Sequence, residues 1–335
     1  MNHDVAAAIN KALDGSDLTK TEVTRLFEVD DLSEEAFAVQ RAGRLLSAGL
    51  LQGKAEIHGQ IGINTGSCPM DCKFCSFAAC NGVFPDASVL SAEDAIAGVN
   101  SMERQGVNAV YVMSTADMDA DRFLELSRAI KDAMISDVPL IANTGDFSLQ
   151  HANDLVDAGY TGVYHAIRMG EGEFTRIPVA RRIKSIENAR EAGLQVGMCV
   201  EPVGPEHSVE ELVEKTLLTR DLGACFSGAM RRTSIPTSPL AAHGQLSYAR
   251  MATIVAAVAL ATGAAVPGNC THEPNGLGVF AGANLLWTEV GSNPRDVEAE
   301  TVRGWTANRC RDLYSECGWE VLEGPSAMFA KTAMR

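Results

Sequence analysis

The chain has 335 residues, of which 46% are hydrophobic and 21% charged, a composition typical of one globular domain with a large core. Its formal net charge of −15 disfavours nucleic acid and anionic membranes as main partners, because like charges repel. No stretch reaches the ~20 apolar residues of a membrane span, and the polar start Met1-Asn-His-Asp lacks a signal-peptide core, so we expect a cytoplasmic protein.

The first 52 residues predict a helical extension in front of the main domain. Thr19-x-x-Glu22 is the pattern of a capping box, in which two side chains satisfy backbone N–H groups at the start of a helix. Leu32–Leu51 then carries hydrophobic residues at helical spacing. We therefore expect residues 1–52 to be helical and residues 53–335 to form the main domain.

From Ile57 onward, short hydrophobic runs typical of strands alternate with segments typical of helices. Helices are expected to begin near Ser91, Asp121, Ser148, Pro178, Ser208 and Ser247, and residues 293–335 are expected to be helical through Cys310. The expected strands are Ile57–Ile63, Ala109–Ser114, Pro139–Asn143, Gly162–Ala166, Leu194–Val200, Cys225–Met230, Ala265–Gly268 and Leu277–Leu286. Repeated helix–glycine–strand units imply parallel strands with right-handed crossovers. Eight of them predict an α/β fold, a (β/α)8 TIM-type barrel that is complete or nearly so.

Three of the nine cysteines stand in one loop directly after the first strand. They form Cys68-Pro-Met-Asp-Cys72-Lys-Phe-Cys75, with the spacing C-x3-C-x2-C. Three thiolates can hold three irons of a cubane cluster and leave the fourth iron open. A zinc site would need a fourth ligand, for which Cys80 is the nearest candidate, and a redox pair would leave Cys68 unexplained. The spacing therefore favours a [4Fe-4S] cluster.

This motif resembles that of the radical S-adenosylmethionine (SAM) superfamily, in its biotin synthase branch, which includes a hydrogenase maturase and methylornithine synthase. Other segments resemble the branch in the same order: Glu191-Ala-Gly-Leu-Gln-Val, Pro202-Val-Gly, Ile235-Pro-Thr-Ser-Pro-Leu240 and Phe280-Ala-Gly-Ala-Asn284. The resemblance implies that SAM binds the open iron and is cleaved reductively to a 5′-deoxyadenosyl radical, which abstracts hydrogen from a small-molecule substrate. It also implies an electron donor of the flavodoxin or ferredoxin type.

The same resemblance, together with the strand ends, indicates residues that bind SAM. Arg168 is the candidate for the SAM carboxylate, because a guanidinium matches it in shape and charge, and Glu171 for its amine or ribose. Both residues could equally form a solvated ion pair. The other candidates are Phe74 beside the adenine, and Ser114, Thr115, Asn143 and Glu201 at strand ends. Ser114 and Thr115 alternatively cap a turn.

Two later strand ends suggest a substrate site. Arg231 and Arg232 follow the sixth strand, where they would hold a substrate carboxylate or else form a basic pair at the surface. His272 and Glu273 lie in the loop after the seventh strand and add an imidazole and a carboxylate to a possible pocket.

The resemblance to biotin synthase fails where that enzyme binds a second, sulfur-donating cluster through three cysteines and an arginine. Here Val112–Met113, Ala142 and Met198 stand near the cysteine positions, and Pro267 near the arginine. We therefore expect chemistry without sulfur insertion, in the biosynthesis of a hydrogenase metal cofactor or an unusual amino acid. Three alternatives stay open: a sulfur-inserting synthase of the biotin or lipoyl type with a cluster on Cys199, Cys225 and Cys270, a non-enzymatic iron–sulfur scaffold or carrier, and a zinc-stabilised barrel.

Overall fold

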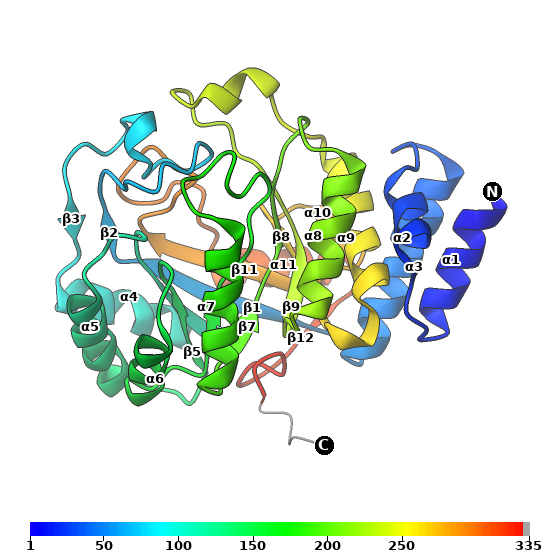
Figure 1. Cartoon of the computed structure of the whole chain (residues 1–335). Coiled ribbons are helices and arrows are strands. Elements are labelled where there is room, and N and C mark those ends of the chain that lie inside the picture. The colour runs from blue at the N-terminus through cyan, green and yellow to red at the C-terminus, as the bar shows by residue number, and fades with distance from the viewer. Residues whose placement is uncertain (331–335) are drawn as a thin grey trace.

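The computed structural model describes residues 1–330, and these begin with three helices (Figure 1): α1 (His3–Leu13), α2 (Lys20–Phe27) and α3 (Glu34–Leu50). Thr19 and Glu22 form the capping box that their spacing predicts. The long helix α3 lies against a helix of the main domain, α9 (Tyr248–Thr262). A Cβ on Gly43 would come within 2.7 Å of Ala256 Cβ, so this glycine allows the two helices to approach closely.

Eight parallel strands close into a barrel, which confirms the predicted (β/α)8 architecture. In order around the barrel they are β1 (Lys54–Gly62), β4 (Ala109–Met113), β5 (Leu140–Asn143), β6 (Gly162–Tyr164), β7 (Gln195–Gly197), β9 (Phe226–Arg231), β10 (Gly268–His272) and β11 (Leu285–Gly291), which pairs with β1 again. Two short strands extend the barrel sheet, β8 (Val200–Val203) beside β9 and β12 (Glu320–Val321) beside β1. Two others, β2 (Asn64–Thr65) and β3 (Ser88–Val89), form a separate two-stranded sheet.

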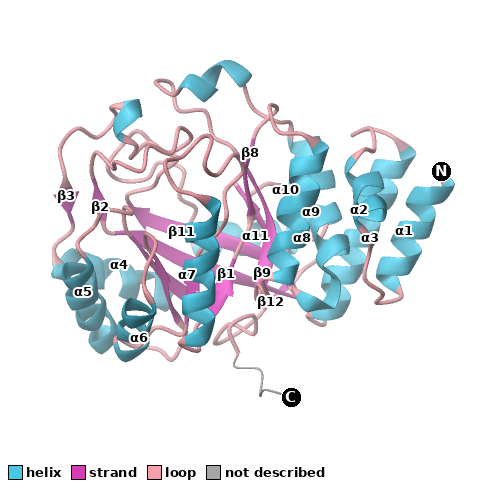
Figure 2. Cartoon of the chain, in the orientation of Figure 1, coloured by secondary structure: helices cyan, strands magenta, loops and turns pink. Residues whose placement is uncertain are grey.

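Helices surround the strands (Figure 2). They are α4 (Ala92–Arg104), α5 (Ala120–Ala133), α6 (Leu149–Asp157), α7 (Val179–Glu191), α8 (Val209–Asp221), α9, α10 (Gly276–Phe280) and α11 (Ala307–Glu316), with 3-10 turns at Ala79–Asn81, Pro239–His243 and Gly263–Ala265. Four of the expected starts are true caps, because the hydroxyls of Ser91, Ser148, Ser208 and Ser247 accept hydrogen bonds from backbone N–H groups in the first turn. Within residues 1–330, one stretch, Tyr248–Ala265, is long and apolar enough for a membrane span, and 67% of it is buried in the fold.

Several predicted boundaries in the second half are wrong. Leu194–Val200 is interrupted at Met198 and Cys199, and the strand expected at Ala265–Gly268 begins only at Gly268. The strand expected at Leu277–Leu286 begins as helix α10, which Asn275 caps by accepting a hydrogen bond from the Gly278 N–H, and becomes a strand only at Leu285. The segment after Asn293 is a loop up to α11 and not a helix, and residues 331–335 of the predicted terminal segment lie outside the described part.

Aromatic side chains fill the lower part of the barrel. His58, Tyr111, Phe226 and Trp287 point inward from four strands and contact one another through their rings. Phe329 joins them from the C-terminal segment, which lies at the end of the barrel opposite the long loops (Figure 1). The floor of the barrel is therefore aromatic and buried, with His58 held between Glu56 (2.8 Å) and the Tyr111 hydroxyl (3.0 Å).

Candidate active site

A cavity opens above this floor, at the carboxyl ends of the strands, where (β/α)8 barrels hold their active sites. It is lined from all around the barrel. The lining includes Gln60, Met113, Asn143, Tyr164, Cys199, Glu201, Met230, Cys270, His272, Trp287 and Glu289, together with the three cysteines of the loop.

The cysteine loop is closed on itself and anchored to distant parts of the chain. The Cys68 N–H donates to the Phe77 carbonyl (2.8 Å), and the Ala79 N–H donates to the Cys68 carbonyl (3.0 Å). The Lys73 N–H donates to the Phe174 carbonyl, and the Ser76 N–H to the Pro294 carbonyl, both at 2.8 Å. Segments after β6 and after β11 thus fix the loop over the barrel.

The three loop thiols lie together at one side of the cavity, and all three line it. Burial raises the pKa of Cys68, Cys72 and Cys75, in the last case to about 12, so the thiolate forms need a positively charged partner. Among residues 1–330, no three His, Cys, Asp or Glu side chains converge closely enough for a single metal ion. In a cubane each thiolate binds a different iron, so its ligands need not converge on one point. The donor set therefore fits an iron–sulfur cluster.

Arg168 stands beside the loop thiols and lines the cavity. Its guanidinium forms an ion pair with Glu201, whose side chain is 5% exposed, and lies 5.6 Å from the centre of the Tyr164 ring. Glu201 is therefore a paired buried carboxylate and orients Arg168 toward the cavity. Glu171, predicted as a ligand for SAM, does not line the cavity: it accepts hydrogen bonds from Thr175 (2.6 Å), from Arg182 (3.3 Å) and from the Arg168 N–H (3.0 Å).

The remaining predicted SAM residues do line the cavity. Phe74 lies in the cysteine loop, Ser114 donates to the Thr144 hydroxyl (3.1 Å), and Asn143 donates to Gln60 (2.9 Å). Thr115 is held by Asn64, which donates to its hydroxyl (2.7 Å) and accepts from its N–H (2.9 Å). The cavity brings these side chains together with the cluster loop, and their assignment to SAM stays a prediction.

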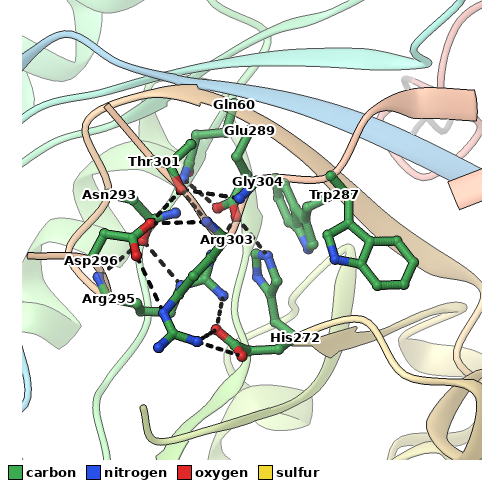
Figure 3. A network of polar contacts seen from close by, with 12 residues as sticks. Gln60, His272, Trp287, Glu289, Asn293, Arg295, Asp296, Thr301, Arg303 and Gly304 are labelled. Atoms are coloured by element: carbon green, nitrogen blue, oxygen red, sulfur yellow. Dashed lines mark hydrogen bonds and ion pairs between the residues drawn. The ribbon is translucent and has the colours of Figure 1, made fainter. Parts of the chain in front are cut away.

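Another side of the cavity is a polar network built from β10, β11 and the following loop (Figure 3). Arg295 forms an ion pair with Glu289 at its centre, His272 Nε2 lies 3.5 Å from Glu289 Oε2, and Gln60 donates to Glu289 (3.3 Å). Burial raises the pKa of Glu289, but the positive charge of Arg295 and the proximity of His272 outweigh it and bring the pKa to about 2. Glu289 is therefore a carboxylate at neutral pH. His272 stacks on Trp287, and burial lowers its pKa.

Three of the predicted substrate residues do not reach the cavity, which corrects those expectations. Arg232 is 1% exposed and is bound by both oxygens of Glu206 and by the carbonyls of Leu240 and Gly244. Arg231 instead donates to the Leu246 carbonyl and lies over the Tyr248 ring.

Glu273 is the third of these residues, and it lies behind the lining, where it pairs with Arg303 (3.1 Å) and Arg295 (3.6 Å). Of the predicted substrate residues, only His272 lines the cavity.

Five residues line the cavity without having been predicted from the sequence: Gln60, Tyr164, Arg182, Glu289 and Arg295. Arg182 comes from α7 and contacts Asp146 (3.3 Å) and His165 (3.3 Å). Burial lowers the pKa of His165 to about 4, with Asp146 opposing the shift, so this imidazole is neutral at pH 7. A signal existed for Glu289 alone, because a carboxylate within an apolar strand is costly unless it is paired.

Comparisons with known proteins agree with this site. Residues 63–218 match the family described as Radical SAM superfamily. The chain is 24% identical over 233 residues to a biotin synthase from Carboxydothermus hydrogenoformans, which covers 66% of this chain and 70% of the relative, and 24% identical over 245 residues to one from Desulforudis audaxviator (70% and 73%).

Two solved structures share the fold of the chain. The FeFe-hydrogenase maturase HydG from C. hydrogenoformans superposes with a TM-score of 0.79 at 16% identity, covering 98% of this chain and 81% of HydG. Methylornithine synthase (PylB) superposes with a TM-score of 0.75 at 16% identity, covering 96% and 98%. Residues 63–218 are therefore a radical SAM domain, and the biotin synthase relatives together with the cysteine loop at the mouth of the barrel support a radical SAM enzyme of the biotin synthase-like branch.

Proposed function

We propose that this enzyme cleaves SAM reductively at a [4Fe-4S] cluster on Cys68, Cys72 and Cys75, and that the resulting 5′-deoxyadenosyl radical takes hydrogen from a small-molecule substrate without sulfur insertion. One observation carries the proposal: the three loop thiols and Arg168 line the same cavity, over a buried aromatic floor. A bound cluster supplies the electron that breaks the sulfonium bond, while the protein positions SAM and excludes water.

The residues around the cavity have separate tasks in this proposal. Arg168 binds the SAM carboxylate with the guanidinium N–H groups that Glu201 leaves free, and Phe74 packs against the adenine. The polar network of Gln60, Glu289 and His272 faces the substrate and suits a small polar molecule with hydrogen-bonding groups. The electron donor is a flavodoxin or ferredoxin, and a cytoplasmic setting keeps the thiols reduced.

The absence of sulfur insertion is supported by the side chains at the strand ends. The residues that the resemblance places at or near the additional cysteine ligands of biotin synthase, Val112–Met113, Ala142 and Met198, carry no thiol. The proposed processes are the biosynthesis of a hydrogenase metal cofactor or of an unusual amino acid. Iron analysis after anaerobic reconstitution separates this proposal from a sulfur-inserting synthase: we expect about four irons per chain, against about six or more with an auxiliary cluster.

The direct test is SAM cleavage. Reconstituted protein is reduced with dithionite, mixed with SAM and assayed for 5′-deoxyadenosine and methionine. Both products are expected from the wild type and from Cys80→Ser, because Cys80 is exposed and lies outside the cavity lining. An intact cluster that yields no 5′-deoxyadenosine would contradict the proposal and favour a scaffold or carrier. A colourless protein that contains zinc would instead favour the zinc-stabilised barrel.

A further inference from the structure

Two cysteines outside the cluster loop meet in the same cavity. Cys199 follows β7 and Cys270 lies in β10, and their Sγ atoms are 2.9 Å apart although 71 positions separate them in the sequence. Both side chains are buried, and both line the cavity. Gly228 on β9 pairs with Cys270, and a Cβ there would lie 2.1 Å from the Cys270 carbonyl oxygen, so no larger residue fits beside the pair.

The surroundings of the two thiols are aromatic. Cys199 and Cys270 pack in one cluster with Tyr164, Phe226 and Trp287, at the boundary between the floor of the barrel and the cavity. Trp287 is 4% exposed, and its indole contacts the Cys270 thiol. The two thiols are therefore enclosed by aromatic side chains and also face the cavity.

The protonation state of Cys270 suits hydrogen-atom transfer. The contact with Cys199 and burial raise the pKa of Cys270 well above its usual value, so that Cys270 carries its S–H hydrogen at neutral pH. A neutral thiol is a poor nucleophile and a poor metal ligand, because both roles belong to the thiolate. The S–H bond is, however, weaker than an unactivated C–H bond, so a carbon radical takes this hydrogen readily.

We propose that Cys199 and Cys270 are a hydrogen-atom donor that quenches carbon-centred radicals in the cavity. The inference rests on the radical chemistry proposed above and deepens it. The carbon radical takes the hydrogen atom of one thiol, which breaks an S–H bond, forms a C–H bond and leaves a thiyl radical. The neighbouring thiol loses a proton and shares the unpaired electron in a sulfur–sulfur radical anion. One electron from the donor of the enzyme and two protons then restore both thiols.

The sum of these steps adds one electron and one proton to the carbon radical. Since the thiol and not 5′-deoxyadenosine returns hydrogen to the product, SAM is consumed. One 5′-deoxyadenosine then accumulates for each product molecule.

Deuterium labelling tests the donor without knowledge of the substrate. Reconstituted enzyme is exchanged into D2O, reduced with dithionite and given SAM alone, so that the 5′-deoxyadenosyl radical itself must be quenched. A thiol donor carries exchangeable deuterium, whereas carbon-bound hydrogens of the protein do not exchange. We expect deuterium in 5′-deoxyadenosine from the wild type and loss of that label in Cys199→Ser and Cys270→Ser, because serine keeps the shape but its O–H bond is too strong to donate.

The matched control is Cys225→Ser, since Cys225 lies in the same aromatic cluster but does not line the cavity. It is expected to keep the label. Equal labelling in the wild type and all three variants would overturn the proposal.

A second measurement detects the proximity of the two thiols and needs neither SAM nor a cluster. Treatment of the cluster-free protein with dilute iodine, an oxidant small enough to enter the cavity and able to oxidise neutral thiols, is expected to join Cys199 to Cys270 by a disulfide, which peptide mapping detects. If no such cross-link forms, the pairing of the two thiols is wrong. If it forms but an intact cluster yields no 5′-deoxyadenosine, the thiol pair stands as a redox site and the proposed radical function fails.

Discussion

The two sides of the cavity are built on opposite principles. On one side, one buried and two half-buried thiols stand in a loop whose backbone is held at both ends, and their raised pKa values mean that a positive partner must come from outside the chain. On the other side, Glu289, Arg295 and His272 neutralise and orient one another, so that the charges are balanced within the protein. The first side is completed by what it binds, and the second is organised before anything binds.

The largest expected effect tests the side that needs an external partner. Replacing Cys72 with serine removes one of the three thiolates, so the cluster is expected to be lost and 5′-deoxyadenosine formation to fall to background. Iron content and visible absorption after anaerobic reconstitution measure the first effect, and the nucleoside assay measures the second. Cys80→Ser provides the control and keeps both, because Cys80 is an exposed cysteine eight positions further on. A Cys72→Ser protein with normal iron content would contradict the proposal that the three loop thiolates hold a cluster, and with it the contrast between the two sides.

The next effect concerns the balanced side. Arg295→Met leaves the Glu289 carboxylate buried without its cation, and breaking a buried ion pair in this way is expected to lower the free energy of unfolding by about 3–5 kcal/mol. Urea denaturation of the cluster-free protein measures the change. Arg303→Met is the matched control, because the Arg303 side chain is 39% exposed, and the expected loss is below about 1 kcal/mol. Similar losses in the two variants would show that the network is not organised around Glu289.

The third prediction concerns Arg168, which lines the cavity together with the loop thiols. Arg168→Ala removes charged hydrogen-bond donors that we assign to the SAM carboxylate, and an increase of about 10- to 100-fold in the dissociation constant for SAM is expected. Arg231→Ala is the control, since Arg231 lies over Tyr248 and outside the lining. Binding measured with the reconstituted, unreduced enzyme keeps the result independent of turnover. Unchanged affinity of Arg168→Ala for SAM would contradict the assignment of Arg168 to the SAM carboxylate.

The smallest expected effect is a dependence of stability on pH. The pKa of His165 is about 4 in the folded chain, against an ordinary value of 6.5, so the unfolded chain binds more protons between pH 6.5 and 4. Stability is therefore expected to fall as the pH is lowered through this window, by about 2 kcal/mol between pH 7 and 5 from this residue. Glu289 does not contribute there, because its stabilisation is lost only below the ordinary carboxyl pKa of 4.5.

Denaturation curves at pH 7 and 5 check this prediction. His165→Gln is expected to reduce the difference between the two curves, while His3→Gln, at an exposed position, is expected to leave it unchanged. A His165→Gln protein with the full pH dependence would assign the effect to other groups.

The sequence predicted the two sides unequally for a physical reason. Cys68, Cys72 and Cys75 are close in the sequence, so their spacing alone reveals the loop, and the glycine-punctuated repeat reveals the barrel. The network on the other side joins Gln60 to residues more than two hundred positions away, each of them ordinary by itself. The last strand was predicted with the wrong bounds: it was expected to end at Leu286, whereas β11 runs from Leu285 to Gly291. Glu289 therefore lay outside every predicted strand.

The arginine pair shows the limit of reading neighbours in a sequence. Arg231 and Arg232 follow one another at a strand end, as a substrate clamp would, but Glu206, 26 positions earlier, binds Arg232 with both oxygens. Only the folded structure shows which carboxylate reaches which guanidinium.

The anchoring of the cysteine loop has a consequence for how the enzyme is made. The carbonyls that fix the backbone beside Cys75 belong to Asn293 and Pro294, which accept hydrogen bonds from the Ser76 side chain and N–H. A ribosome delivers the three cysteines more than 200 residues before it delivers those anchors. During that interval the thiols have no enclosing barrel, so the loop is sheltered only after the segment around Pro294 has been made. Stable loading of the proposed cluster therefore has to wait for that segment.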